Sequence, residues 1–422
     1  MTSVAFVGMT HLGLVSASSV AAKGFKTLCF DPNPALIQRL ATGDLPVSEP
    51  GLDAQIAGNG AGQVFTSAWA DLSRADVVYI APDVPTNDQG ESDLSGIKAL
   101  IAQVLNHLDP DATLVVLCQV PPGFTRRLNR RGERLYYQVE TLVFGRAVER
   151  AMEPERYIIG CADPAAPLPP YFAAVLEAFG CPILPMRYES AELAKVSINM
   201  CLVASVSVAN TMAELCEHVG ADWSEIVPSL KLDRRIGQYS YLAPGLGIAG
   251  GNLERDLATV MRLGAAHGTD TGVVAAQVAN SAHRKNWAAA TVHALGLEAA
   301  RLAVWGLAYK ENTHSVKNSP SLHTLAHLPG AVLTVHDPMV PDDALGFPPE
   351  QAVTRHATPQ EAVAGCDALL ILTPWPEYRG IAPETIAAQL AGQVVLDPYR
   401  VLDHNAARAA GLRYLTLGVG DA

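Results

Sequence analysis

The chain has 422 residues, of which 49% are hydrophobic and 17% are charged, and its 30 basic and 42 acidic residues give a net charge of −12. This composition excludes a disordered chain and favours several domains with large buried cores. A net acidic chain lacks the global field that attracts nucleic acid or an anionic membrane, so any phosphate must be held locally. We therefore expect no nucleic-acid partner and no membrane partner.

The cysteines and the N-terminal segment both indicate a cytoplasmic protein. Seven cysteines are scattered without a C-x-x-C pair, which is typical of reduced thiols rather than of a disulfide framework or a zinc site. The first 22 residues are apolar but contain no Lys or Arg, so they lack the basic region of a signal peptide. No uninterrupted apolar run approaches the ~18 residues of a transmembrane helix.

Short apolar runs alternate with helical stretches in both halves of the chain. One long helix is predicted at 188–219, because this stretch contains no Pro or Gly, and it ends at Gly220. The predicted strands are, in chain order, 3–7, 27–30, three runs ending near residues 80, 117 and 159, and then 302–305, 332–336, 368–372 and 394–396.

This alternation predicts an α/β protein with two Rossmann-like, doubly wound parallel-sheet domains joined by a long central helix. We place the domains at 1–187, 188–298 and 299–422. The long helix suits a domain bridge and a dimer face, and an ordinary core helix is the alternative. The two α/β halves share an architecture but no detectable sequence repeat.

A dinucleotide-binding turn is predicted between the first strand and the first helix. Gly8 permits a tight turn, Gly13 permits close packing of the helix, and the helix N-terminus offers N–H groups to a pyrophosphate. Asp31, at the end of the second strand, would accept hydrogen bonds from ribose hydroxyls and favour NAD over NADP. Thr10 replaces the middle glycine of the pattern, so its side chain would either displace the cofactor or donate a hydroxyl to it.

Several further motifs follow in order along the chain. They are GDLPVSEPGL at 43–52, GESDLS at 90–95, VPPG at 120–123, ELAKVSIN at 192–199, DRRIG at 233–237, GLAYKENT at 306–313 with Ser319-Pro320, HDP at 336–338 and WPEY at 375–378. With these motifs the chain resembles the UDP-glucose/GDP-mannose dehydrogenase family over nearly its whole length.

The resemblance implies an NAD domain, a central helical domain used for dimerisation, and a C-terminal nucleotide-sugar domain. It also implies a homodimer, a role in polysaccharide biosynthesis, and a UDP-sugar rather than a GDP-sugar as substrate. Members of the family oxidise a sugar C6 alcohol to a carboxylate in two NAD-dependent steps. The second step passes through a thiohemiacetal on a cysteine.

The catalytic cysteine of that family has no counterpart here. The family loop G-x-G-F/I-G-G-S-C-F-P-K-D aligns with 245–256, and Asn252 stands at the cysteine position. A thiolate can add to an aldehyde, whereas an amide nitrogen is not nucleophilic. Asn252 can only hydrogen-bond an alcohol, a carbonyl oxygen or a gem-diol, so the usual route to the acid is closed.

Other departures from the family pattern lie near the same chemistry. Gln119 and Val84 each replace a threonine, and Lys317 replaces an arginine. Phe144 replaces the second glutamate of E-F-L-R-E-G. Glu254-Arg255 stand in place of P-K. In the family motif D-G-R-N, which is Asp397-Pro-Tyr-Arg400 here, the arginine is shifted by one residue.

The first oxidation requires a base for the hydroxyl proton and a cation for the developing alkoxide. The resemblance assigns these roles to the catalytic set Lys195, Asn199, Asp256, Asn252 and Glu140. Lys195 would donate to the substrate oxygen, and Asn199 shares its helix face because it lies four residues further on. Asp256 would orient a water that acts as the base, with Glu140 as a second candidate.

Two more sets of residues complete the predicted site. The cofactor-binding set is Gly8, Thr10, His11, Leu12, Gly13, Asp31, Val84, Gln119 and Lys317. The substrate-binding set is Arg235, Tyr241, Gly247 and Lys310. No metal site is expected, because His323 and His327 lack the glutamate of H-E-x-x-H and a third ligand.

Three functions remain open at this point. The first is a nucleotide-sugar oxidoreductase limited to a single two-electron step between alcohol and carbonyl. The second is a four-electron 6-dehydrogenase in which Asn252 holds a hydrated aldehyde. The third is a catalytically inactive binder of NAD or a nucleotide sugar, which the residues at 10, 84 and 119 would explain.

Overall fold

The computed structural model describes residues 2–85, 87, 91–344, 347 and 351–420. Gly90, the first residue of the motif at 90–95, lies outside the described residues. The chain forms two compact units, Met1–Ile198 and Asn199–Ala422. The boundary falls inside the long helix, and the predicted division into three domains stays a prediction.

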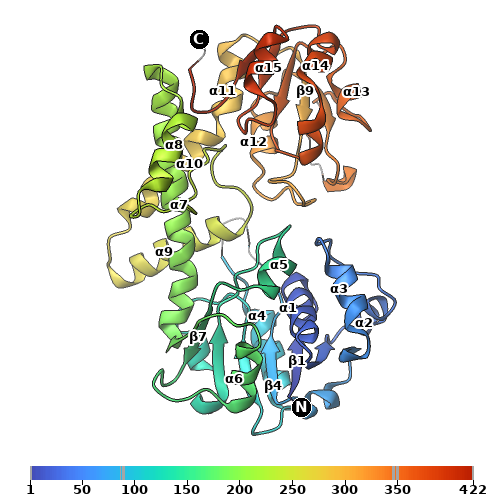
Figure 1. The fold of residues 1–422 in the computed structure, drawn as a ribbon, viewed down its shortest axis with the longest axis vertical. Helices are drawn as coiled ribbons and strands as arrows, with labels where there is room; N and C mark the ends of the chain where they lie inside the picture. The colour runs from blue at the N-terminus through green and yellow to red at the C-terminus, as the bar shows by residue number, and fades with distance from the viewer. Residues whose placement is uncertain (1, 86, 88–90, 345–346, 348–350, 421–422) are drawn as a thin grey trace. The chain divides into compact units, whose positions relative to one another are not determined.

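The first unit is built on an eight-stranded sheet (Figure 1). Its strand order is β3-β2-β1-β4-β5-β6-β7-β8, and all neighbours are parallel except β6 and β7. The strands are β1 Ser3–Val7, β2 Lys26–Phe30, β3 Gln63–Thr66, β4 Val77–Ile80, β5 Thr113–Val116, β6 Leu135–Gln138, β7 Tyr157–Cys161 and β8 Ile183–Arg187. The helices are α1 His11–Ala22, α2 Pro34–Ala41, α3 Leu52–Asn59, α4 Ser95–Leu105, α5 Ala147–Met152 and α6 Pro170–Glu177, with 3₁₀ turns at Gly60–Gly62, Trp69–Arg74, Thr125–Arg127 and Gly132–Arg134.

The second unit combines a helical part with a six-stranded parallel sheet of order β11-β10-β9-β12-β13-β14. Its strands are β9 Arg301–Trp305, β10 Val332–His336, β11 Val353–Arg355, β12 Ala368–Ile371, β13 Val394–Leu396 and β14 Arg413–Leu415. Its helices are α8 Trp223–Leu232, α9 Asn252–His267, α10 Gly272–Lys285, α11 Trp287–Ala294, α12 Pro320–Ala326, α13 Pro359–Val363, α14 Pro383–Gln389 and α15 His404–Ala409, with 3₁₀ turns at Asp342–Ala344 and Pro376–Gly380. The predicted fold class is confirmed, with one antiparallel strand pair as the exception.

The two sheets repeat the same local arrangement although their sequences do not repeat. After β1, the Gly8 N–H donates to the Phe30 carbonyl at 2.9 Å, and after β9 the Gly306 N–H donates to the His336 carbonyl at 2.8 Å. In both sheets an aspartate that follows the neighbouring strand accepts from this turn: Asp31 from Met9 N–H at 2.9 Å, and Asp337 from Leu307 N–H at 2.7 Å. The common geometry therefore comes from the strand-to-helix crossover itself.

The long helix α7, Tyr188–Val219, has the predicted bounds. Among the described residues it alone is long and apolar enough to cross a membrane, with a window of mean hydropathy 1.5 that is 33% buried. Core helices of soluble proteins have the same length and composition.

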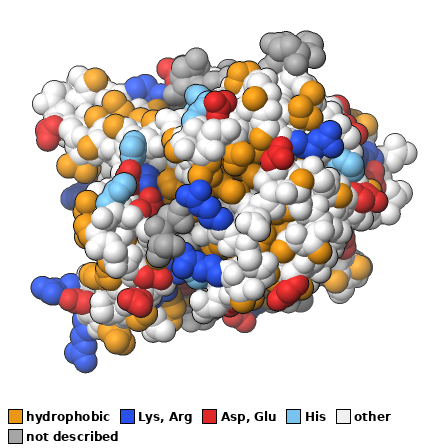
Figure 2. Space-filling model, turned by 90° about the horizontal axis from the view of Figure 1, so that it is seen from above, with side chains coloured by type: hydrophobic (Ala, Val, Ile, Leu, Met, Phe, Trp, Pro, Cys, Tyr) orange, Lys and Arg blue, Asp and Glu red, His pale blue; other side chains and the backbone are white. Residues whose placement is uncertain are grey.

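Charged side chains of both signs are interspersed over the face drawn in Figure 2.

Candidate active site

The turn after β1 has the geometry of a dinucleotide cradle. Gly8 has a φ of 98°, a region that favours glycine, and Pro82 packs directly against it. A Cβ atom on Gly13 would lie 1.8 Å from the Gly8 carbonyl oxygen. The end of β1 therefore packs tightly against the start of α1, whose first backbone N–H groups have no acceptor within the helix and whose dipole favours a phosphate. These features fit NAD.

Thr10 uses its side chain within the protein. The Asp83 N–H donates to Thr10 Oγ1 at 2.8 Å, so the oxygen faces the loop that follows β4. This contact tests neither of the two expectations for Thr10, which were that it displaces the cofactor or that it donates a hydrogen bond to it. It shows that the threonine, unlike a glycine, connects the turn to the loop after β4 by a hydrogen bond.

The other predicted cofactor residues of the first unit surround this turn. Both carboxylate oxygens of Asp31 accept backbone hydrogen bonds, one from Met9 at 2.9 Å and one from Asn33 at 2.9 Å. Leu12 is buried in the core, and Val84 packs against the edge of that core. Gln119 is partly buried directly after the fully buried Cys118.

His11 is held by a contact that the sequence did not predict. Its Nε2 lies 3.0 Å from Glu49 Oε2, and its ring stacks on Phe144 with the centroids 4.1 Å apart. His11 is also the first residue of α1, so its backbone N–H has no acceptor within the helix. The sequence signal for Glu49 was its place in the motif at 43–52, but nothing in that motif indicated His11 as its partner.

The first unit brings Lys195 and Glu140 together. Lys195 Nζ lies 2.7 Å from Glu140 Oε1 and donates to the Glu140 carbonyl oxygen at 3.0 Å. The second carboxylate oxygen of Glu140 accepts from the Leu142 N–H at 3.0 Å. Both side chains are largely buried, with 12% and 17% exposure. The pair places an ammonium beside a carboxylate, which are the cation and the base that alcohol oxidation needs.

Glu192 lies one turn before Lys195 on α7 and is fully buried. Its carboxylate accepts from the Gly123 N–H at 2.5 Å and the Thr125 N–H at 2.8 Å. Burial raises the pKa of this carboxyl, and the two backbone donors oppose that rise. Glu192 therefore anchors the loop at 120–125 to α7, a structural role within the motif at 192–199.

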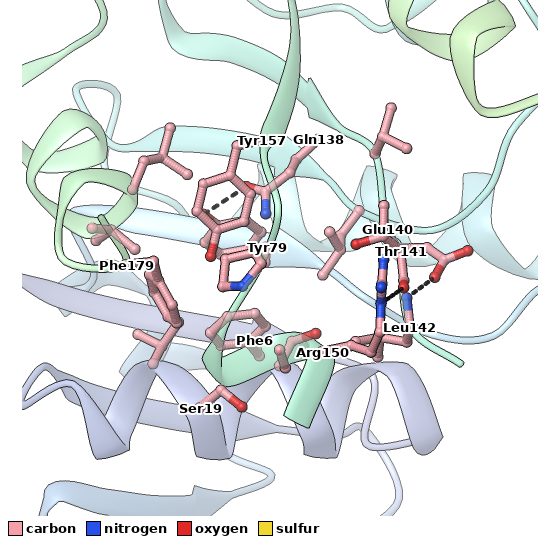
Figure 3. Close-up of a pocket in the computed structure, with 18 residues that line it drawn as sticks. Phe6, Ser19, Tyr79, Gln138, Glu140, Thr141, Leu142, Arg150, Tyr157 and Phe179 are labelled. Atoms are coloured by element: carbon pink, nitrogen blue, oxygen red, sulfur yellow. Dashed lines mark hydrogen bonds between the residues drawn. The ribbon is translucent and has the colours of Figure 1, made fainter. Parts of the chain in front are cut away.

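A cavity of about 50 Å³ lies behind the Glu140 segment (Figure 3). Its wall includes the consecutive residues Gln138–Leu142, and Tyr79 donates to Gln138 Oε1 at 3.1 Å. Arg150 of α5 enters the same view and donates from Nε to the Thr141 carbonyl at 3.3 Å. Polar contacts from Tyr79 and Arg150 therefore help to hold this segment beside the cavity.

The second unit brings Asn199 and Asp256 together. Asn199 donates from Nδ2 to one carboxylate oxygen of Asp256 at 2.5 Å, and Arg255 Nε lies 3.3 Å from the other. Asp256 is 1% exposed, so its charge is held by a buried cation and an amide. Arg255, which we noted from the sequence only as a difference from the family pattern, is thus a direct partner of the predicted catalytic aspartate.

The glycine-rich loop at 245–251 leads into α9. A Cβ atom on Gly247 would lie 2.4 Å from the Ser281 carbonyl oxygen, and the Ser281 hydroxyl oxygen accepts from the Ile248 N–H at 2.8 Å. This packing against α10 fixes the loop. Asn252 is the first residue of α9, and its side chain is exposed.

The remaining predicted residues lie elsewhere in the second unit. The Lys317 side chain passes 3.4 Å from the Cβ position of Gly251, so it lies against the glycine-rich loop. Arg235 is exposed and pairs with Asp233 at 2.6 Å, and Tyr241 is half exposed. Lys310 Nζ lies 5.8 Å from the centre of the Tyr309 ring.

Metal binding has no candidate among the described residues, where no three His, Cys, Asp or Glu side chains form a group that could hold an ion. His323 and His327 stack on each other with centroids 4.4 Å apart. His323 Nε2 lies 2.9 Å from Asn286 Oδ1, and His327 Nδ1 lies 2.8 Å from the His323 carbonyl oxygen.

Three family models match consecutive parts of the chain. They are the NAD binding domain at 2–176, the central domain at 189–283 and the UDP binding domain at 303–404 of the UDP-glucose/GDP-mannose dehydrogenase family. The chain belongs to this family. It is a nucleotide-sugar dehydrogenase-like oxidoreductase, and its cofactor is NAD, as predicted.

Similar proteins agree over the full length. The chain is 30% identical to UDP-glucose 6-dehydrogenase TuaD of Bacillus subtilis, over 99% of this chain and 93% of that protein. It is also 30% identical to the UDP-glucose 6-dehydrogenase of Pseudomonas aeruginosa, over 98% and 96%. The structure of a UDP-glucose dehydrogenase from Pyrobaculum islandicum superimposes with a TM-score of 0.87 at 27% identity, covering 100% of this chain and 98% of that one.

Proposed function

We propose that this protein oxidises a UDP-sugar with NAD in a single two-electron step, from an alcohol to a carbonyl. The observation that carries the proposal is Asn252 at the exposed start of α9, where the family resemblance calls for a cysteine. The match of 303–404 to a UDP binding domain supports UDP over GDP. The three model matches likewise support functional parts at 1–187, 188–298 and 299–422.

The reaction breaks the C–H and O–H bonds of one sugar alcohol and forms one carbonyl. When bound, NAD accepts the hydride, and the proton leaves to a base. Lys195 stabilises the developing alkoxide, and Glu140, 2.7 Å from its ammonium, holds the proton or passes it to water. Asn199, on α7 like Lys195, and Asp256, on α9, form a second polar pair, which orients a water or the sugar hydroxyl.

None of the seven cysteines lies on the loop at 245–256. Five are buried, and burial raises the pKa of the thiol in each: Cys29, Cys118, Cys161, Cys216 and Cys366. A thiol with a raised pKa is a poor nucleophile at neutral pH. Asn252 contributes hydrogen bonds instead, to an alcohol, a carbonyl oxygen or a hydrated aldehyde.

The decisive experiment counts NADH formed per sugar consumed, with UDP-sugars and GDP-sugars offered in turn. One NADH and a carbonyl product support the proposal. Two NADH and an acid refute it in favour of the four-electron reaction. Calorimetry with NAD tests the inactive alternative that Thr10, Val84 and Gln119 suggest, because micromolar binding together with turnover contradicts it.

We further propose a cytoplasmic homodimer formed through α7, with a role in polysaccharide biosynthesis. Val208, Met212, Leu215 and Val219 are all at least 40% exposed and recur at helical spacing on one face. An apolar stripe of this kind marks an association surface. Light scattering at micromolar concentration tests the dimer, and a monomeric mass refutes it.

A further inference from the structure

The buried carboxylate of Glu49 joins three parts of the first unit. Its side chain has no exposed surface. One oxygen lies 3.0 Å from His11 Nε2 and accepts from the Gly145 N–H at 3.1 Å, while the other accepts from the Ala147 N–H at 2.7 Å. A buried carboxylate with this many partners strongly restricts the relative positions of the segments that supply them.

One of these segments belongs to the cofactor turn. His11 is the first residue of α1, so its position determines where the N-terminal N–H groups of that helix point. The ring is held between the Glu49 carboxylate and the Phe144 ring, whose centroid is 4.1 Å away. A dinucleotide bound at 8–13 would therefore restrict the position of His11 and, through it, the hydrogen bond between His11 and Glu49.

The second segment that Glu49 contacts, at 145–147, lies at the far end of the loop that starts at Glu140. Gly145 and Ala147 end this loop, and Glu140, at its beginning, holds Lys195 at 2.7 Å. The cavity behind Gln138–Leu142 borders the start of this loop (Figure 3). Polar contacts at both ends of the loop, at Glu140 and at 145–147, contribute to its position.

We propose that Glu49 is a positioning residue that couples dinucleotide binding at the turn to the placement of the Glu140–Lys195 pair. The inference rests on the proposed function, because it takes Glu140 and Lys195 to act on the sugar hydroxyl. Glu49 acts through backbone N–H groups and His11, and it does not itself touch the reacting atoms.

Hydrogen exchange on the full chain with and without NAD tests this coupling without measuring activity. In the wild type, NAD binding should slow exchange of the Gly145 and Ala147 amides. E49Q keeps the shape of the side chain but turns one acceptor into a donor, so these two amides should exchange about 10-fold faster. In E49Q, NAD binding should no longer slow exchange of the Gly145 and Ala147 amides.

Asp76 provides a matched control in the same unit. Its carboxylate accepts from the Ser3 N–H at 2.8 Å, at the opposite end of β1 from the cofactor turn. D76N should lose a comparable hydrogen bond, yet it should keep the NAD-dependent protection at 145–147 and the turnover rate. A merely structural role for Glu49 would make the two variants behave alike.

Kinetics provide the second readout. E49Q should lower kcat by up to about 100-fold, as expected for a displaced catalytic pair, with a smaller change in the KM for NAD. The double variant E49Q/E140Q should have a kcat only slightly lower than that of E140Q alone. The proposal is overturned by additive losses, by retained protection in E49Q, or by a wild type in which NAD leaves the 145–147 amides unchanged. The proposed function fails separately, when the wild type makes no NADH from any nucleotide sugar.

Discussion

The substitution N252C tests why this chain would stop after one oxidation. Asn252 is exposed and begins the 16-residue helix α9. Because the N-cap of α9 is Gly251 and no side chain caps the helix, a change at this exposed position should alter the free energy of unfolding by less than about 0.5 kcal/mol. The variant should therefore fold, and any change in stoichiometry then reports on chemistry.

The position also favours a reactive thiolate. The N-terminus of a helix stabilises a negative charge by about 0.3–1 kcal/mol, which raises the thiolate fraction about 2- to 5-fold over that of a free cysteine. A thiolate can add to the aldehyde produced by the first oxidation and prepare it for a second. We expect the end point to rise from one to two NADH per sugar, with the acid as product.

The assay is an end-point measurement of NADH with limiting sugar, combined with mass spectrometry of the product. N252S is the matched control, because its hydroxyl is small and polar but is not ionised at neutral pH. It should remain at one NADH per sugar. If N252C also remains at one, although alkylation shows that the introduced thiol is reactive and the first oxidation is intact, residue 252 is not what limits the reaction.

Three further predictions address the cradle, the buried glutamate and the helix surface. G13A should lose about 1–3 kcal/mol of stability and most NAD binding, because the new methyl meets the Gly8 oxygen at 1.8 Å. G96A, in α4 with open space around it, should gain about 0.5–1 kcal/mol. Because burial raises the pKa of Glu192, its folded form retains a proton that the unfolded form releases, so urea titrations should show the wild type losing stability relative to E192Q as pH rises above the usual carboxyl range. V208E should convert the dimer to a monomer in light scattering, because it puts a charge on the apolar stripe of α7.

Each of these predictions can fail in a specific way. Equal melting temperatures for G13A and G96A would show that the turn is looser than its geometry indicates. A stability difference between wild type and E192Q that is constant with pH would mean that Glu192 titrates normally. A V208E variant that keeps its dimeric mass would place the association surface elsewhere.

Local patterns determined much of this protein from its sequence alone. The turn at 8–13, nine of the strands and the bounds of α7 follow from glycine placement and from the periodicity of apolar residues, which act between near neighbours in the chain. The strands β3, β6, β8, β11 and β14 were not predicted. Lys195 and Asn199 could be placed on one helix face for the same reason. The family resemblance then supplied the expectation of NAD, which the comparisons confirmed.

The tertiary structure decided which partners these residues have. Glu49 reaches His11 across 38 positions and Ala147 across 98, and Asn199 reaches Asp256 across 57. No periodicity encodes such pairs, because they depend on where separate strands and loops cross in space. The same reason explains Thr10, whose hydroxyl oxygen faces Asp83 rather than any group that its own turn could indicate. The sequence therefore identified the chemical groups of the site, and the fold determined which of them hold one another in place.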